Sequence, residues 1–388
     1  MIKGETPAAR SKNAAQLADR IGADMVIYGY LTPEDDAESL TLEFYYAAPV
    51  RAGDPDATTG AHEIGTPIRS EVSAASNEST AKRQLSGPLA QRAAALFWLT
   101  QGLSYDLAND PDTALKILQE AEQKLTDWKD DEGKEVLYLF LARAAMWARQ
   151  YDIAIRAAER AISINPNYAN AYGVLGTALM DRAQLFYIRG RTLTPEEQAC
   201  ISTANIDNAA ETVEEAADNA RAIAVLEDGL HAAPQAHWPP VEHYLRLILG
   251  LAYRLEAQDD IFAGNFGAAE PSLDRAKAEF EDALTYFSQE NYPALYASTV
   301  AGLAATHRYW AHLRIVDATM SPDPATANGD RKEAAAFLQQ TIDGYQACLD
   351  QQQRTRGNPI FQKRVLKCSC IPYQAEARNT LASLGDTP

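Results

Sequence analysis

The chain has few cysteines for its length. Its four cysteines, Cys200, Cys348, Cys368 and Cys370, are too few and too widely spaced for the disulfide framework of a small secreted protein. In Cys368-Ser369-Cys370 one residue separates the thiols, whereas redox and zinc motifs have two. We therefore expect ordinary thiols in a reducing compartment, which predicts a cytoplasmic protein.

The chain also lacks long hydrophobic runs. No stretch of about 18 apolar residues is present, so we expect no direct membrane insertion. The first residues, Met1-Ile2-Lys3-Gly4-Glu5, lack the apolar segment of a signal peptide.

Basic residues are scarce relative to acidic ones. The chain has 53 Asp and Glu residues and 35 Lys and Arg residues, which gives a formal net charge of −18. Because phosphate contacts need clustered Lys and Arg, this balance argues against nucleic acid as a partner, and against adsorption to anionic lipid. The acidic surface predicts solubility through net charge, and a surface shaped for a basic partner is the alternative.

Motifs of known catalytic sites are missing as well. There is no Gly-rich phosphate loop, no G-x-S-x-G turn and no H-E-x-x-H pair. His307 and His312 are five residues apart, so they do not lie on the same face of a helix. His237 and His243 flank Pro239-Pro240. We expect no catalytic residue, no metal site and no cofactor. An unrecognised enzyme is the least favoured alternative, with its pocket near His307, Tyr309 and His312.

What the chain does contain is a repeat of about 34 residues. The first copy reads Trp98-x-x-Gln101-Gly102-x-x-Tyr105 and continues with Ala114, Leu118 and Ala121. The second copy has the apolar and small residues Tyr138, Leu141, Ala142, Tyr151, Ala154, Ala158, Ala161 and Ile162, and it closes on Asn165-Pro166. This pattern resembles the tetratricopeptide (TPR) family, whose helical hairpins stack into a solenoid with a concave groove.

Three further copies are stretched. They begin at Tyr172, Leu249 and Ala301, and each has small residues followed by a second apolar helix. We predict a mainly α TPR-like α-solenoid of about five helical hairpins over residues 86–388, closed by a capping helix at Tyr373–Leu384. The extra residues form inserts at about 180–220, 258–274 and 315–332. We interpret the first as longer helices plus a loop with a short helix, the second as an enlarged connection around Gly264–Ser272, and the third, which contains Ser321–Gly329, as a loop. All lie between the two helices of a hairpin, which favours one binding side or, alternatively, neutral drift in a tolerant turn.

Residues 1–85 differ from the repeats. Ala8–Ile21 has helical spacing and ends at Gly22, whereas Met25–Leu31 and Leu40–Tyr46 have strand character. The run Leu17-Ala18-x-x-Ile21-Gly22-Ala23-Asp24, with Val26–Leu31 after it, resembles the closing part of TolB amino-terminal and CsgG-like α/β domains, as found in bacterial multi-repeat TPR proteins. That resemblance implies earlier strands and an anchor upstream, so that Met1 would be an internal start. The alternative is a two-strand cap on the solenoid that is specific to this protein.

The family resemblance also locates a groove, because its concave lining comes from one face of the first helix of each hairpin. On this basis the candidate residues of a protein-binding groove are Leu99, Leu103, Leu139, Arg143, Met146, Trp147, Asn170 and Thr177. Chaperone-binding members hold a terminal carboxylate there with Lys, Asn and Arg, but here Arg143 alone could do so. We therefore expect a non-enzymatic scaffold that binds an apolar or amphipathic peptide segment of a protein partner.

Two alternatives to this function stay open. The groove could be filled within the chain, by the N-terminal segment or by the long insert, since an exposed apolar trough is a liability in a soluble protein. The chain could also be the sensor or assembly arm of a membrane-anchored envelope protein whose anchor lies upstream of Met1.

Overall fold

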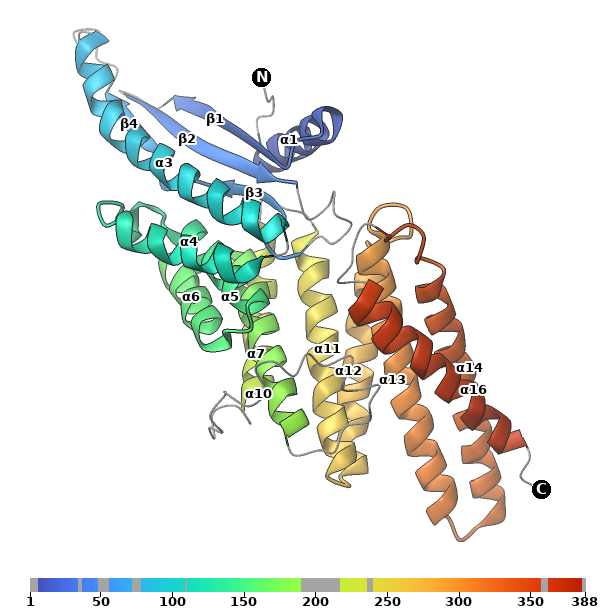
Figure 1. Ribbon diagram of the computed structural model, residues 1–388. Coiled ribbons are helices and arrows are strands. Elements are labelled where there is room, and N and C mark those ends of the chain that lie inside the picture. The colour runs from blue at the N-terminus through green and yellow to red at the C-terminus, as the bar shows by residue number, and fades with distance from the viewer. Residues whose placement is uncertain are drawn as a thin grey trace. The chain divides into compact units, whose positions relative to one another are not determined.

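A computed structural model describes residues 6–33, 37–47, 56–71, 78–108, 110–189, 217–235, 240–356 and 362–385 (Figure 1). The chain divides into two compact units, described separately below. Unit 1 comprises residues 1–51, 56–178 and 228–241, and unit 2 comprises residues 52–55, 179–227 and 242–388. Most of the described residues are helical, which confirms the mainly α class.

The first helix of unit 1, α1, spans Pro7–Ile21 and is closed at both ends by local signals. The Thr6 hydroxyl accepts a hydrogen bond from the backbone N–H of Ala9 at 3.2 Å, and Pro7 stands in the first turn. Gly22 ends the helix with φ 68°, a left-handed conformation that glycine adopts without steric cost. The predicted helix and its stop are therefore confirmed.

An antiparallel sheet of four strands follows α1. Strand β1 (Met25–Pro33) pairs with β2 (Ala37–Tyr46), and β2 pairs on its other side with β3 (Gly60–Glu63) and β4 (Ile68–Glu71). The two predicted strands are confirmed, but the sheet has two more short strands than predicted.

Helices cover both faces of this sheet. On one face, Ala14 and Ala18 of α1 pack against Val26 and Tyr45. On the other face, the ring of Phe44 lies 5.8 Å from that of Phe140, which belongs to the repeat helices of unit 1. Successive strand residues point to opposite faces of a sheet, so on β2 Tyr45 faces α1 and its neighbour Phe44 faces the repeat helices.

Helical hairpins make up the rest of unit 1. Their helices are α3 (Glu78–Leu107), α4 (Pro111–Lys124), α5 (Glu135–Trp147), α6 (Tyr151–Ile164) and the first half of α7 (Ala169–Arg189), with a short 3-10 turn, η1, at Asp130–Glu132. A Cβ added to Gly102 would lie 2.8 Å from Cγ of Leu118, so the glycine of the repeat signature lets α3 and α4 approach closely. The predicted domain boundary near residue 85 lies inside α3.

Unit 2 contains further helix pairs. Its helices are the second half of α7, most of α10 (Asp218–Ala232), α11 (Val241–Phe262), α12 (Phe266–Leu284), α13 (Pro293–Met320), α14 (Pro324–Leu349) and α16 (Ile371–Gly385). Two shorter helices are η3 (Ala233–Gln235), in unit 1, and the π-helix η4 (Gln362–Cys370), in unit 2. Phe280 of α12 fits against Gly250 and Gly302, where an added Cβ would lie 2.9 Å and 2.6 Å from the ring.

The predicted inserts of unit 2 are helix rather than loop. Only Ala263–Asn265 separates α11 from α12, and only Ser321–Asp323 separates α13 from α14. Pro324 begins α14, and the Asp323 side chain caps it by accepting hydrogen bonds from the N–H groups of Ala325 and Thr326. The Pro- and Asp-rich segment therefore marks a helix start. Residues 190–216, which hold most of the first insert, lie outside the described residues.

The C-terminal helix α16 packs along α14, where a capping helix was predicted (Figure 1). Beside it, Cys348 and Cys370 form a disulfide that joins α14 to the end of η4. The prediction of ordinary thiols is wrong for these two residues, because sequence spacing does not show which cysteines the fold brings together. No helix in the described part of the chain is long and apolar enough to cross a membrane.

Candidate functional site

Two of the predicted groove residues, Arg143 and Asn170, contact a turn of the same chain. The apolar ones lie inside the unit, with Leu99 and Leu139 fully buried and Leu103 and Met146 nearly so. Thr177 donates its hydroxyl hydrogen to the carbonyl oxygen of Gly173 at 2.8 Å, within its own helix. The predicted residues considered further are therefore Arg143, Trp147 and Asn170.

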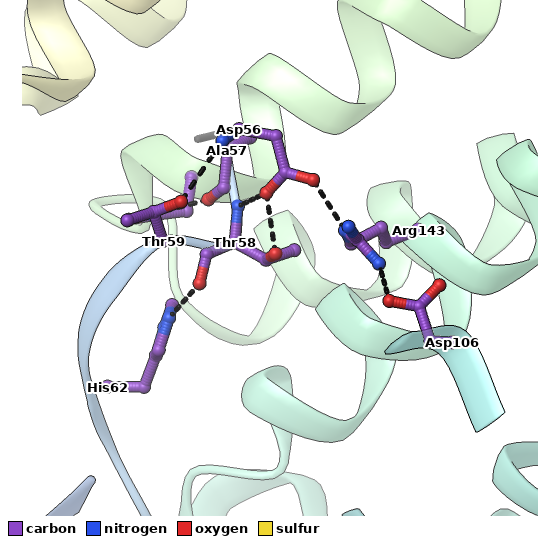
Figure 2. Close-up of polar contacts among 8 residues, drawn as sticks. Asp56, Ala57, Thr58, Thr59, His62, Asp106 and Arg143 are labelled. Atoms are coloured by element: carbon purple, nitrogen blue, oxygen red, sulfur yellow. Dashed lines mark hydrogen bonds and ion pairs between the residues drawn. The ribbon is translucent and has the colours of Figure 1, made fainter. Parts of the chain in front are cut away.

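The turn itself is Asp56–Thr59, which leads into β3. The N–H of Thr59 donates to the carbonyl oxygen of Asp56 at 3.0 Å, and the Asp56 carboxylate accepts from the N–H and hydroxyl of Thr58 at 2.8 and 2.6 Å. These local bonds give a compact turn with its carboxylate pointing toward Arg143 (Figure 2). Ala57, Thr58 and Thr59 are almost completely buried.

Arg143, on α5, binds two carboxylates. Its Nε lies 2.6 Å from Oδ2 of Asp56, and its Nη1 pairs with Asp106 at the end of α3 (Figure 2). Burial alone would lower the pKa of Arg143, but the charges of Asp106 and Asp56 raise it well above its ordinary value. The arginine is therefore a permanent cation that ties the turn to two helices.

Trp147 stands one helical turn after Arg143. The centre of its ring lies 6.0 Å from the guanidinium carbon of Arg143, and the side chain is half-buried. An aromatic ring at the margin of a buried cation offers an apolar surface next to a charge.

Asn170 and His62 hold the main chain of the turn. The side-chain amide of Asn170, on α7, donates to the carbonyl oxygen of Ala57 at 2.5 Å. His62 has Nε2 2.7 Å from the carbonyl oxygen of Thr58 and Nδ1 2.7 Å from the hydroxyl of Tyr168. Since a carbonyl oxygen only accepts, Nε2 carries the proton and Nδ1 accepts from Tyr168 when the ring is neutral. Burial raises the pKa of Tyr168 well above its ordinary value, which keeps this donor protonated.

Sequence reasoning found Arg143 and Asn170 but missed their partners. Asp56, Ala57 and Asp106 belong to no motif, because a turn and a helix end have no periodic pattern. The alternative in which the N-terminal segment fills the groove agrees with these contacts.

Two histidines of unit 2 stack on aromatic rings. Burial, with Lys277 nearby, lowers the pKa of His307 to about 4, and its ring stacks on Phe337. Burial and Arg308 lower the pKa of His312, and Tyr309 donates to Gln258 at 2.5 Å. No group of three His, Cys, Asp or Glu residues able to hold a metal occurs among the described residues. His243 stacks on Tyr286, while His237 lies outside the described residues.

A hollow of about 390 Å³ lies elsewhere on unit 1, over α4, α5 and α6. Its lining mixes charged, polar and apolar side chains: Gln119, Glu122, Tyr138, Leu141, Ile153, Arg156, Ala157 and Arg160. Arg160 in this lining is paired with Asp130.

No family model matches the chain, and no curated protein matches it. One similar solved structure is that of TTC0263, a thermophilic TPR protein of Thermus thermophilus. It is 17% identical, with a TM-score of 0.36, and the match covers 67% of this chain and 96% of that one.

Proposed function

We propose that the chain is a non-enzymatic protein-interaction scaffold whose partner binds at Arg143, Trp147 and Asn170. The observation that carries this proposal is how these helices hold Asp56–Thr59. Asn170 donates to a main-chain oxygen and Arg143 pairs with a carboxylate, and neither contact requires that the turn belong to the same chain. A partner segment with the same chemistry could take the place of the turn.

The electrostatics define that segment. Displacing the turn removes one of the two carboxylates on buried Arg143, so the site favours an occupant that brings a carboxylate in its place. Asp106 stays on Arg143 whichever occupant is present and holds the guanidinium in position. The partner is therefore an amphipathic peptide segment with a carboxylate for Arg143, a main-chain carbonyl for Asn170, and an apolar side chain for the ring of Trp147.

A labelled peptide with the sequence of residues 54–60 tests this exchange directly. Fluorescence anisotropy would measure its binding to the full chain, to Asp56→Ala and to the double variant Asp56→Ala/Arg143→Gln. We expect the tightest binding to Asp56→Ala, because its own turn no longer competes for the arginine. Adding Arg143→Gln should remove that binding, and a peptide carrying Ala at position 56 should bind none of them.

Thermal unfolding of each variant controls for loss of fold. If folded Asp56→Ala fails to bind the peptide, or binds it equally well without Arg143, the site is an internal contact and the proposal is wrong.

A second candidate function is the soluble arm of a membrane-anchored envelope protein. The disulfide between Cys348 and Cys370 favours it, because such bonds persist in oxidising compartments and are rare in the cytosol. Source cells would be treated with a membrane-permeant thiol reagent before lysis, and the peptides containing Cys348 and Cys370 analysed by mass spectrometry. Unmodified, bonded cysteines in an envelope fraction would support this location, whereas alkylated cysteines in the cytosolic fraction would contradict it.

A further inference from the structure

The sheet of unit 1 has an open edge at β1. Among the strands of the described chain, β1 pairs with β2 alone, whereas β2 has partners on both sides (Figure 1). In a strand, alternate residues direct their N–H and C=O groups to opposite edges. The outer edge of β1 therefore presents a row of main-chain donors and acceptors that another strand could pair with.

This edge lacks the usual protection against pairing. Proteins protect edge strands with charged residues, prolines or bulges. Met25–Pro33 has no charged residue, although the chain carries a net charge of −18, and its proline stands at the last position. The edge is also long, at nine residues. A second strand could therefore pair along it without facing a charged residue of β1. The nearby guanidinium of Arg10, on α1, lies over the ring of Tyr30, 3.5 Å from its centre.

Exposed apolar side chains lie along the same strand. Ile27 is 52% exposed and Leu31 is 61% exposed, and their spacing places them on one face of the sheet. Between them, a Cβ added to Gly29 would lie 3.2 Å from Leu42 and 3.4 Å from Leu40, so the leucines of β2 extend over this glycine. Together these residues form an apolar strip that reaches the open edge.

The strand is nearly symmetric about Gly29. Tyrosines flank the glycine at positions 28 and 30, and large aliphatic residues follow at 27 and 31. In an antiparallel pair of identical strands centred on Gly29, Ile27 stands opposite Leu31 of the second copy, and Tyr28 stands opposite Tyr30 of the second copy. A register shifted by one residue would put the exposed aliphatic side chains on opposite faces. Shifting either strand by two would place Ile27 opposite Gly29 or Pro33 instead.

We propose that β1 pairs antiparallel with β1 of a second copy of this chain, giving a two-fold dimer with one continuous sheet. An isologous interface requires a surface that is complementary to itself, and the sequence on both sides of Gly29 meets this condition. The pairing satisfies the main-chain groups of the edge and brings the two apolar strips together. Aliphatic and aromatic cross-strand pairs then stabilise it.

Sedimentation velocity of the full chain over a range of micromolar concentrations tests the dimer. We expect a reversible shift from monomer to dimer, which Leu31→Lys should abolish because the lysine of each copy would face Ile27 of the other. Phe97→Lys is the matched control, because Phe97 on α3 is 57% exposed and lies in a helix rather than on the edge. A wild-type chain that stays monomeric overturns the proposal, as does a dimer that Leu31→Lys leaves intact.

Cysteine cross-linking tests the register independently. Opposed residues of antiparallel strands have Cα atoms about 4.5–5.5 Å apart, within the range that a disulfide spans. The double variant Ile27→Cys/Leu31→Cys should therefore give a covalent dimer on a non-reducing gel. Ile27→Cys alone should not, because its copy lies four residues away along the strand, about 13 Å. The wild-type chain measures the background from native cysteines, and equal cross-linking in all three would contradict this register.

Discussion

Asn170 donates a hydrogen bond of 2.5 Å to the main-chain oxygen of Ala57, which precedes it by 113 residues. Both residues are buried, at 3% exposed each. A buried carbonyl without a partner is costly, so this amide makes the turn at Asp56–Thr59 compatible with the interior of the helical hairpins. The contact joins the α/β part of unit 1 to its repeats.

Asn170→Leu should lower the free energy of unfolding by about 1–3 kcal/mol, because it leaves the carbonyl of Ala57 buried and unpaired. Chemical denaturation monitored by circular dichroism would measure the change. Asn167→Leu is the control, since that residue is exposed at the end of the loop before α7, and it should change stability by less than about 0.5 kcal/mol. Equal effects of the two substitutions would show that the hydrogen bond makes no net contribution to the free energy of unfolding.

Arg143→Gln should destabilise unit 1 by about 3–5 kcal/mol, because two carboxylates would lose their cation in a buried place. Adding Asp56→Asn and Asp106→Asn should recover part of this loss, since the remaining groups are then all neutral. Thermal unfolding of the single and the triple variant would measure this recovery of stability. A triple variant less stable than Arg143→Gln alone would mean that the carboxylates stabilise the fold by other contacts.

Gly302→Ala should destabilise unit 2 by about 1–3 kcal/mol, because the new methyl group would lie 2.6 Å from atoms of the Phe280 ring. Gly329→Ala, on the neighbouring helix α14, has nothing within 4 Å of the added group. That control should be neutral or stabilising by up to about 1 kcal/mol, from helix propensity. Differential scanning calorimetry would compare the two, and a Gly302→Ala variant as stable as the wild type would argue against the close packing of α13 on α12.

His307 should make the stability of unit 2 depend on pH. Burial, followed by the charge of Lys277, lowers its pKa from the ordinary value of 6.5 to about 4. The unfolded chain therefore takes up the proton first as pH falls, so the contribution is complete above pH 6.5 and is lost between pH 6.5 and about 4. The loss of unfolding free energy across this range is about 3 kcal/mol.

The variant His307→Gln isolates this effect, because it removes the titrating group. Urea unfolding at several pH values should show a shallower decline for His307→Gln than for the wild type. Parallel curves for His307→Gln and the wild type would contradict burial of this ring.

Much of the fold followed from local patterns. The spacing of Trp98, Gly102 and Tyr105 predicts a helix that packs closely on the next one, and the structure places α3 on α4 with Gly102 against Leu118. The stop at Gly22 and the two strands after it were also predicted, because capping and alternation act over a few residues. The segment Ser321–Gly329 was misinterpreted, since Pro after Asp signals a helix start as well as a loop.

The sequence by itself determined the mainly helical class, the first helix and the first two strands, because these depend on periodicity and on neighbours within a turn. The short strands β3 and β4 and the short connections of unit 2 did not follow from it. Only the tertiary structure decided that the turn Asp56–Thr59 lies against Asn170, which carboxylates meet Arg143, and that Cys348 lies beside Cys370. Those contacts join residues far apart in the chain. A turn such as Asp56–Thr59 has no periodic pattern, so its sequence does not predict which helices it packs against. The same holds for the open edge of β1, whose apolar residues are evident in the sequence but whose exposure depends on how the sheet is ordered.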